Sequence, residues 1–169
     1  IFAQGPPPTA NTPHFKAHLR LTEGELKKAI IVDDRQKLTV DSDAREGTLE
    51  IKIPIVDATK APNLPIQSWD GHKPLDQFLK STVYIQADQP ALRTKATEII
   101  NGETNAWKAA EKLCRWVHES IHDKNLKIGF GSATQTLASL EGDCTEHTVL
   151  LIALARSVGI PERVCAGLV

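Results

Sequence analysis

The 169-residue sequence predicts an α+β protein, in which an antiparallel β-rich domain precedes a helical domain. In the first half of the chain, apolar and polar residues alternate, which is typical of half-buried strands. In the second half, apolar residues recur at the spacing of amphipathic helices. We therefore predict a leader or linker over residues 1–13, a β-rich domain over residues 14–86 and a helical domain over residues 87–169.

Three segments carry the alternating pattern of the β-rich domain. The first runs from His14 to Leu21, the second is the short segment Leu38–Val40, and the third spans Thr48–Val56. Because Pro54 cannot donate a ladder hydrogen bond, it makes the third segment an edge strand or marks its end. Stretches rich in Asp, Gly and Pro separate these runs and predict loops.

The helical domain begins with two segments that have a helical period. Residues 91–100 form the first, and residues 106–121, capped by Thr104 or Asn105, form the second. A short helix is expected near residues 134–140. The helical pattern then resumes at a cysteine.

The segment Gly142–His147, with the sequence GDCTEH, places that cysteine at the start of a helix. Asp143 suits the N-cap, and Glu146, three residues later, completes a capping box, so Cys144 takes the first helical position. The positive end of the helix dipole favours a thiolate there. The carboxylates of Glu141, Asp143 and Glu146 oppose it. We therefore expect Cys144 to be a weak nucleophile without a cationic partner.

The rest of this helix is almost entirely apolar. The run Val149–Val158 leaves it hardly any polar side, which predicts a helix that is covered all round. Gly159 can take the left-handed conformation that ends a helix, and Pro161 cannot continue one.

These residues resemble the active-site segment of the transglutaminase-like superfamily, in the form common in bacterial proteins. The resemblance is close over Gly142–Val169, through the GDCTEH start, the ALAR sequence at Ala153–Arg156 and the GIP turn, and it extends more weakly back to about Ala91. It implies a papain-like fold, in which Cys144 is the catalytic residue. The family's histidine and aspartate partners lie on strands after this helix. We therefore expect this chain to be truncated before them and inactive by itself.

The resemblance also implies a reaction. Cys144 would attack the carbonyl of a peptide or protein amide and form a thioester, which water or an amine would resolve. The resemblance is compatible with two kinds of enzyme, a thiol protease-like hydrolase and an acyltransferase. Neither a metal nor an organic cofactor is expected. An alternative is a non-catalytic binding or scaffold module with the same fold.

A second alternative comes from the segment His118–His122, which matches the HExxH pattern of zinc metalloproteases. On a helix, His118 and His122 could bind zinc while Glu119 acts as a general base. However, no third ligand with recognisable spacing follows, and the apolar stripe of the helix turns both histidines toward solvent. We expect no metal site here.

His147, on the same helix face as Cys144, is expected to pack or to form a hydrogen bond.

The composition excludes several classes of function. A hydrophobic content of 41% with 24% charged residues is ordinary for a globular protein, and a formal net charge of −1 gives no reason to expect nucleic-acid binding. No apolar run approaches the roughly 20 residues of a membrane span.

Cys114 and Cys165 lie in patterns that predict a buried helix and a buried strand, so we expect both to be small core residues.

Both ends of the sequence suggest that the chain is a piece of a longer protein. The chain starts at Ile1 and contains no methionine, so Ile1–Gln4 is interpreted either as the remnant of a removed signal peptide or as an engineered boundary. We expect a periplasmic or secreted bacterial protein. Residues 163–169 predict a strand covered on both faces, and its unpaired edge would allow self-association.

Overall fold

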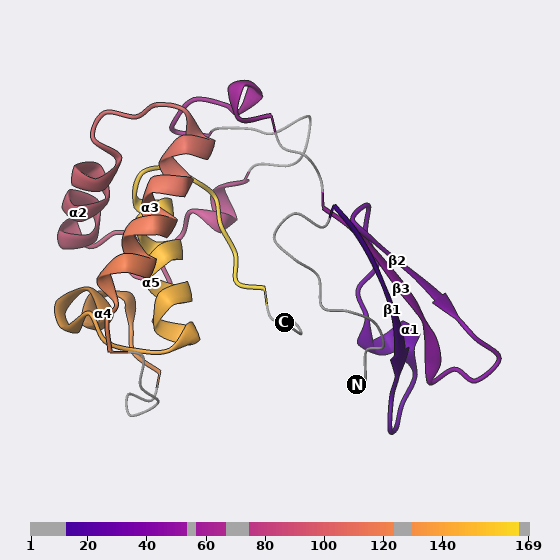
Figure 1. Ribbon diagram of the computed structural model, residues 1–169. Coiled ribbons are helices and arrows are strands. Elements are labelled where there is room, and N and C mark those ends of the chain that lie inside the picture. Colours follow the sequence, from indigo (N-terminus) through magenta and orange to yellow (C-terminus); the bar gives the residue numbers. More distant parts are fainter. Residues whose placement is uncertain (1–12, 54–56, 67–74, 124–129, 166–169) are drawn as a thin grey trace. The chain divides into compact units, whose positions relative to one another are not determined.

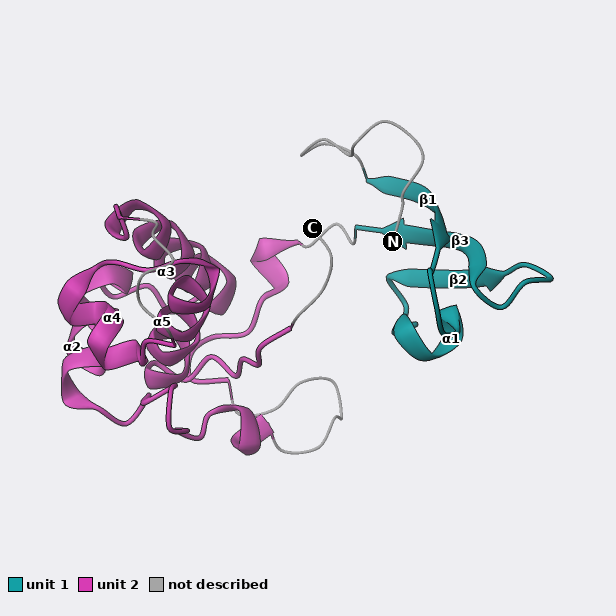
Figure 2. Cartoon of the chain, turned by 90° about the horizontal axis from the view of Figure 1, so that it is seen from below, with its two compact units in different colours: residues 1–56 teal, residues 57–169 magenta. Residues whose placement is uncertain are grey.

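The computed structural model describes residues 13–53, 57–66, 75–123 and 130–165 (Figure 1). The chain divides into two compact units, residues 1–56 and residues 57–169, which Figure 2 colours separately. The first unit is built on strands and the second on helices, which confirms the predicted α+β class.

The sheet of the first unit contains three antiparallel strands in the order β1-β3-β2. They are β1 (His14–Arg20), β2 (Gln36–Val40) and β3 (Glu46–Lys52), and the short helix α1 (Leu26–Ala29) lies between β1 and β2 in the sequence. One face of the sheet is apolar because alternate residues point the same way. The buried residues on that side are Ala17, Leu19, Leu26 and Leu49.

The three predicted strands are therefore present with small differences at their ends. The strand predicted from Thr48 begins two residues earlier, at Glu46, and ends at Lys52. Ile53 follows the strand, and residues 54–56 lie outside the described residues.

The predicted end of the β-rich domain near residue 86 does not coincide with the division between the two units. Residues 57–66 belong with the helices because backbone hydrogen bonds hold them there. The Ala106 N–H donates to the Pro62 carbonyl and the Leu64 N–H to the Thr104 carbonyl, both within 3.0 Å. The Ile66 N–H donates to the Gly159 carbonyl at 2.9 Å.

The helical unit packs three helices around a central one. The outer helices are α2 (Pro90–Ile100), α3 (Ala106–Ser120) and α4 (Ala133–Ser139), and all three contact α5 (Cys144–Ser157). Two short 3₁₀ turns, η1 (Ala58–Lys60) and η2 (Leu75–Phe78), precede them. None of the described helices combines the length and the apolar character that crossing a bilayer requires.

Most of helix α5 is buried, as its apolar sequence predicts, but it is not covered all round, because Cys144 is exposed and Thr148 and Leu151 are only partly buried. The fully buried residues of α5 are Leu150, Ala153, Leu154 and Ala155, each with no exposed area. Of the two predicted caps of α3, the structure uses Asn105, whose side chain accepts a hydrogen bond from the Lys108 N–H at 3.1 Å.

The predictions that Cys114 and Cys165 are buried were wrong. Cys114 is exposed, because the buried stripe of α3 runs through Ala109, Leu113 and Val117 and leaves the next position outside. Cys165 is also exposed, and residues 163–165 form no strand. The rest of that predicted strand, residues 166–169, lies outside the described residues.

Leu154 offers a test of the central role of α5. Changing Leu154 to Ala removes buried side-chain contacts and should lower the free energy of unfolding of residues 57–169 by about 2–5 kcal/mol. Urea titration followed by tryptophan fluorescence measures this change. All three tryptophans, Trp69, Trp107 and Trp116, lie in this unit.

The matched control is Val83→Ala, because the Val83 side chain belongs to the same unit and is 80% exposed. It should change the free energy of unfolding by no more than about 0.5 kcal/mol. Equal losses in the two variants would contradict a core centred on α5.

Candidate active site

The first turn of α5 carries the cysteine that the sequence singles out. Cys144 is the first residue of the helix and is exposed. Asp143 is the N-cap, and its carboxylate accepts a hydrogen bond from the Thr145 N–H at 2.8 Å. Glu146 reaches back and accepts from the Asp143 N–H at 3.0 Å, so the predicted capping box is confirmed.

The Glu146 carboxylate makes a second contact that the sequence did not predict. It is 1% exposed, and its other oxygen accepts a hydrogen bond from the Gly131 N–H at 2.8 Å. One buried side chain therefore joins the loop before α4 to the N-cap of α5. Since a buried carboxylate is costly unless it is hydrogen-bonded, each oxygen has one backbone donor.

Two glycines allow this carboxylate to lie so close to the backbone. Gly142 has a φ of +144°, and a Cβ added there would lie 2.3 Å from the Cβ of Glu146. A Cβ added at Gly131 would lie 3.2 Å from the Cγ of Glu146. The Gly142 N–H also donates to the Asp123 carbonyl at 3.0 Å, which ties the cysteine loop to the segment after α3.

The loop before α4 is itself well anchored. The Ser132 and Gln135 side chains form a capping box on α4, and the Ala133 N–H donates to the Tyr84 carbonyl at 2.8 Å. The Thr136 hydroxyl donates to the Ser132 carbonyl at 2.9 Å. Glu146 thus holds the cysteine turn against a fixed neighbour.

Asp143 also faces the thiol. The Thr145 N–H is the main reason that the pKa of the Asp143 carboxyl lies below its usual value, and the Cys144 thiol adds to this as a hydrogen-bond donor. The thiol therefore lies between the positive helix end and a carboxylate, the two opposing influences that the sequence predicts.

His147 forms a hydrogen bond within the first turn of α5. Its Nδ1 lies 2.6 Å from the Asp143 carbonyl oxygen. Because a carbonyl oxygen only accepts, Nδ1 carries the proton, and the ring is held beside the backbone of its own helix. This contact is the hydrogen-bonding role expected for His147.

The HExxH segment does not form a helical histidine pair. Helix α3 ends at Ser120, and Ile121 has an extended conformation and is buried, so His118 lies in the last turn while His122 lies beyond the helix. Both histidines are exposed. Among the described residues, neither belongs to a group of three possible metal ligands.

Comparison with known proteins shows that part of the helical unit is similar to a known family. Residues 93–169 match the family model described as the transglutaminase-like superfamily. A protein from Haemophilus influenzae is 31% identical over 98 residues, which is 56% of this chain and 26% of that protein. Residues 93–169 are therefore similar to the transglutaminase-like superfamily.

A solved structure shows the same fold. A candidate cysteine protease from Cytophaga hutchinsonii superposes with a TM-score of 0.62 at 14% sequence identity. The alignment covers 88% of this chain and 62% of that chain. This chain thus spans about a quarter of the length of the Haemophilus influenzae relative and less than two thirds of the Cytophaga hutchinsonii chain.

Gly142 offers a test of the close packing at the cysteine turn. Gly142→Ala would place a Cβ against Glu146 at a φ of +144°, so the variant should lose more than about 2 kcal/mol of the free energy of unfolding. Urea titration by tryptophan fluorescence measures the loss.

The control for this variant is Gly102→Ala. Gly102 has a φ of +75°, but a Cβ there would have nothing within 4 Å, so only backbone strain of about 1 kcal/mol is expected. If Gly142→Ala is no less stable than Gly102→Ala, the contact between Gly142 and Glu146 is not as tight as described.

Proposed function

We propose that the protein containing this chain is a transglutaminase-like cysteine enzyme, with Cys144 as the nucleophile toward peptide or protein amides. The observation that supports this most directly is an exposed thiol on the first residue of a buried helix, held by a capping box. The family of residues 93–169 and the protease-like fold support the same class of reaction.

The reaction proceeds through an acyl-enzyme. The Cys144 sulfur, after losing its proton to a base, attacks the amide carbon, and the carbonyl oxygen becomes an oxyanion. The C–N bond then breaks, the leaving amine takes up a proton, and a thioester remains on Cys144. Attack by water on the thioester gives a carboxylic acid, and attack by an amine gives a new amide. Either reaction releases the Cys144 thiol.

The start of α5 has one backbone donor available for the oxyanion. The Thr145 and Glu146 N–H groups donate to the Asp143 side chain, and the Asp143 N–H donates to Glu146. Within the described part of the chain, no acceptor takes the Cys144 N–H. That group therefore suits an oxyanion hole, in which backbone donors stabilise the developing charge.

A complete site also needs a base. Within the described ranges, the partner of the thiol is the Asp143 carboxylate, and His147 directs its Nδ1 proton to the Asp143 carbonyl oxygen. We propose that the histidine and aspartate of the family's triad come from strands that follow α5 in the whole protein. Without them, amide turnover should be lower by several orders of magnitude.

The nucleophile is tested with the full-length protein. It is incubated with a pool of peptide amides, quenched in acid and digested, and mass spectrometry then searches for an acyl adduct on the Cys144 peptide. Cys144→Ala should remove the adduct and lower turnover by more than about a thousandfold. Iodoacetamide should inhibit the unchanged protein.

Cys114→Ala is the matched control, because Cys114 is also an exposed free thiol of the helical unit. It should keep both the adduct and the turnover. Turnover that survives in Cys144→Ala would exclude the proposed nucleophile. A full-length protein with neither adduct nor turnover would favour the non-catalytic binding module instead.

A further inference from the structure

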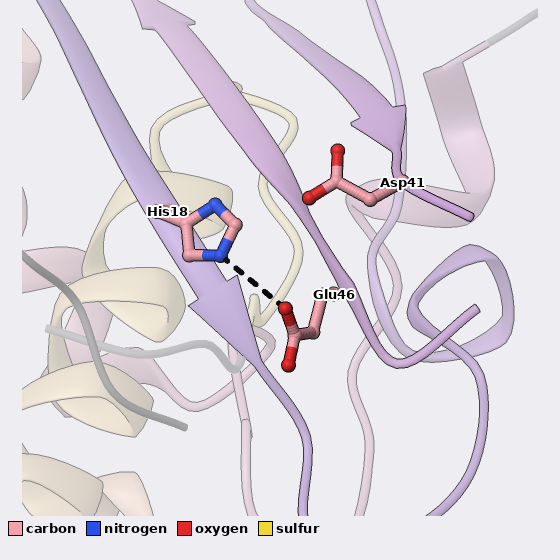
Figure 3. A group of neighbouring side chains, drawn as sticks. All are labelled: His18, Asp41 and Glu46. Carbon is pink, nitrogen blue, oxygen red and sulfur yellow. Dashed lines mark ion pairs between the residues drawn. The ribbon is translucent and has the colours of Figure 1, made fainter. Parts of the chain in front are cut away.

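The polar face of the sheet carries a group of side chains far in the sequence from the cysteine. His18, Asp41 and Glu46 each direct one nitrogen or oxygen atom toward a common space, and these three atoms all lie within 4.8 Å of one another (Figure 3). One imidazole and two carboxylates are ligand types that bind divalent transition ions.

The strand register explains why the three side chains meet. On β1 and β3, Arg20 pairs with Glu46 and His18 with Thr48, so His18 and Glu46 are diagonal neighbours on the same face. Asp41 follows β2, and its N–H donates to the Glu46 carbonyl at 2.9 Å. The group therefore draws one residue from β1, one from β3 and the residue that follows β2.

The charges around the group leave one carboxylate without a cationic partner. The Arg20 Nε lies 3.0 Å from one Glu46 oxygen, while the other Glu46 oxygen lies 3.9 Å from the His18 Nε2. Among the described residues, Asp41 has no ion pair. A cation placed between the three side chains would balance this charge.

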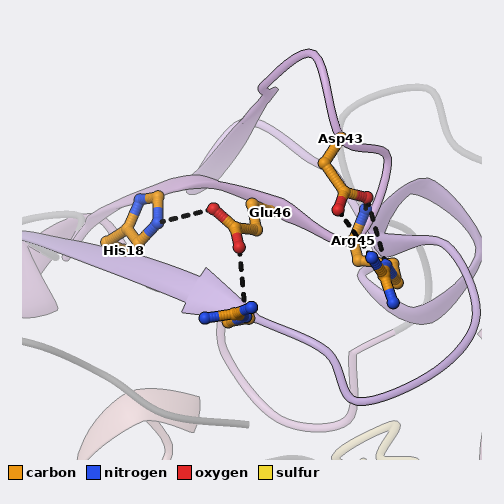
Figure 4. A network of polar contacts seen from close by, with 5 residues as sticks. His18, Asp43, Arg45 and Glu46 are labelled. Carbon is orange, nitrogen blue, oxygen red and sulfur yellow. Dashed lines mark hydrogen bonds and ion pairs between the residues drawn. The ribbon is translucent and has the colours of Figure 1, made fainter.

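The neighbouring carboxylate, Asp43, is not a competing ligand. Its side chain forms an ion pair with Arg45, at 2.8 Å, within the turn that joins β2 and β3 (Figure 4). The Arg45 guanidinium is the main reason that the pKa of Asp43 falls to about 2. Asp43 is thus already neutralised by its own partner.

We infer that His18, Asp41 and Glu46 form a binding site for a divalent transition ion. Zn²⁺ is the ion with which the site is tested. Zinc binds nitrogen and oxygen ligands at about 2.0–2.2 Å in a tetrahedral arrangement, so ligand atoms around one ion lie roughly 3.4 Å apart. To bind zinc, the exposed Asp41 side chain and the partly exposed His18 and Glu46 side chains would rotate to bring their ligand atoms closer than the 4.8 Å that now spans them. Water completes the coordination.

The mixed ligand set also sets the preference among ions. Calcium and magnesium favour sites made wholly of oxygen atoms, so the His18 nitrogen selects against them. A bound ion would join β1 to the β2–β3 hairpin, and would therefore stabilise the sheet unit by binding its folded form.

Calorimetric titration of Zn²⁺ into the 169-residue chain tests the site, after the three cysteines have been alkylated with iodoacetamide to remove thiol ligands. His18→Ala and Asp41→Asn should each weaken Zn²⁺ binding at least about tenfold. Circular dichroism of each variant checks that the sheet remains folded.

His14→Ala is the matched control. His14 also lies on β1, and its Nε2 contacts Glu50 at 2.6 Å, but it belongs to no group of three ligands in the part of the chain that the structure describes. This variant should keep Zn²⁺ affinity within about twofold. The site is refuted if His18→Ala and Asp41→Asn bind Zn²⁺ as the unchanged chain does, or if the unchanged chain does not bind Zn²⁺ at all.

Discussion

The buried carboxylate of Glu146 is the interaction on which the cysteine turn depends. Its two oxygens accept hydrogen bonds from the Gly131 and Asp143 N–H groups, so one side chain fixes both a neighbouring loop and the cap of α5. Removing the carboxylate would leave two backbone donors without partners, each costing about 1–3 kcal/mol if they stayed buried. Gly142 is required because a side chain at this position would overlap Glu146. The exposure of the Cys144 thiol follows from this arrangement.

Much of the fold could be predicted because the deciding interactions are local. The helices are set by period and capping, as at Asp143 and Glu146, where donor and acceptor lie three residues apart. The strand alternation predicted β1 in the same way. The position of Cys144 at a helix start was therefore available from the sequence.

What could not be predicted depends on contacts between residues distant in the sequence. Glu146 suggests a cap by its position, but nothing in the sequence indicates that it also binds Gly131, since that contact needs α4 folded against α5. Likewise, Leu64 and Ile66 join the helical unit through hydrogen bonds to Thr104 and Gly159. These bonds hold residues 57–66 in the helical unit, so the boundary between the two units lies between residues 56 and 57 and not near residue 86.

The most direct test of this account is hydrogen exchange at the Gly131 and Asp143 amides, followed by NMR. If Glu146 holds both donors as described, the two amides should exchange slowly and at similar rates, close to those of the buried residues of α5. Exchange at the rate of an exposed loop amide, while the α5 core stays protected, would show that Glu146 does not hold the cysteine turn in place.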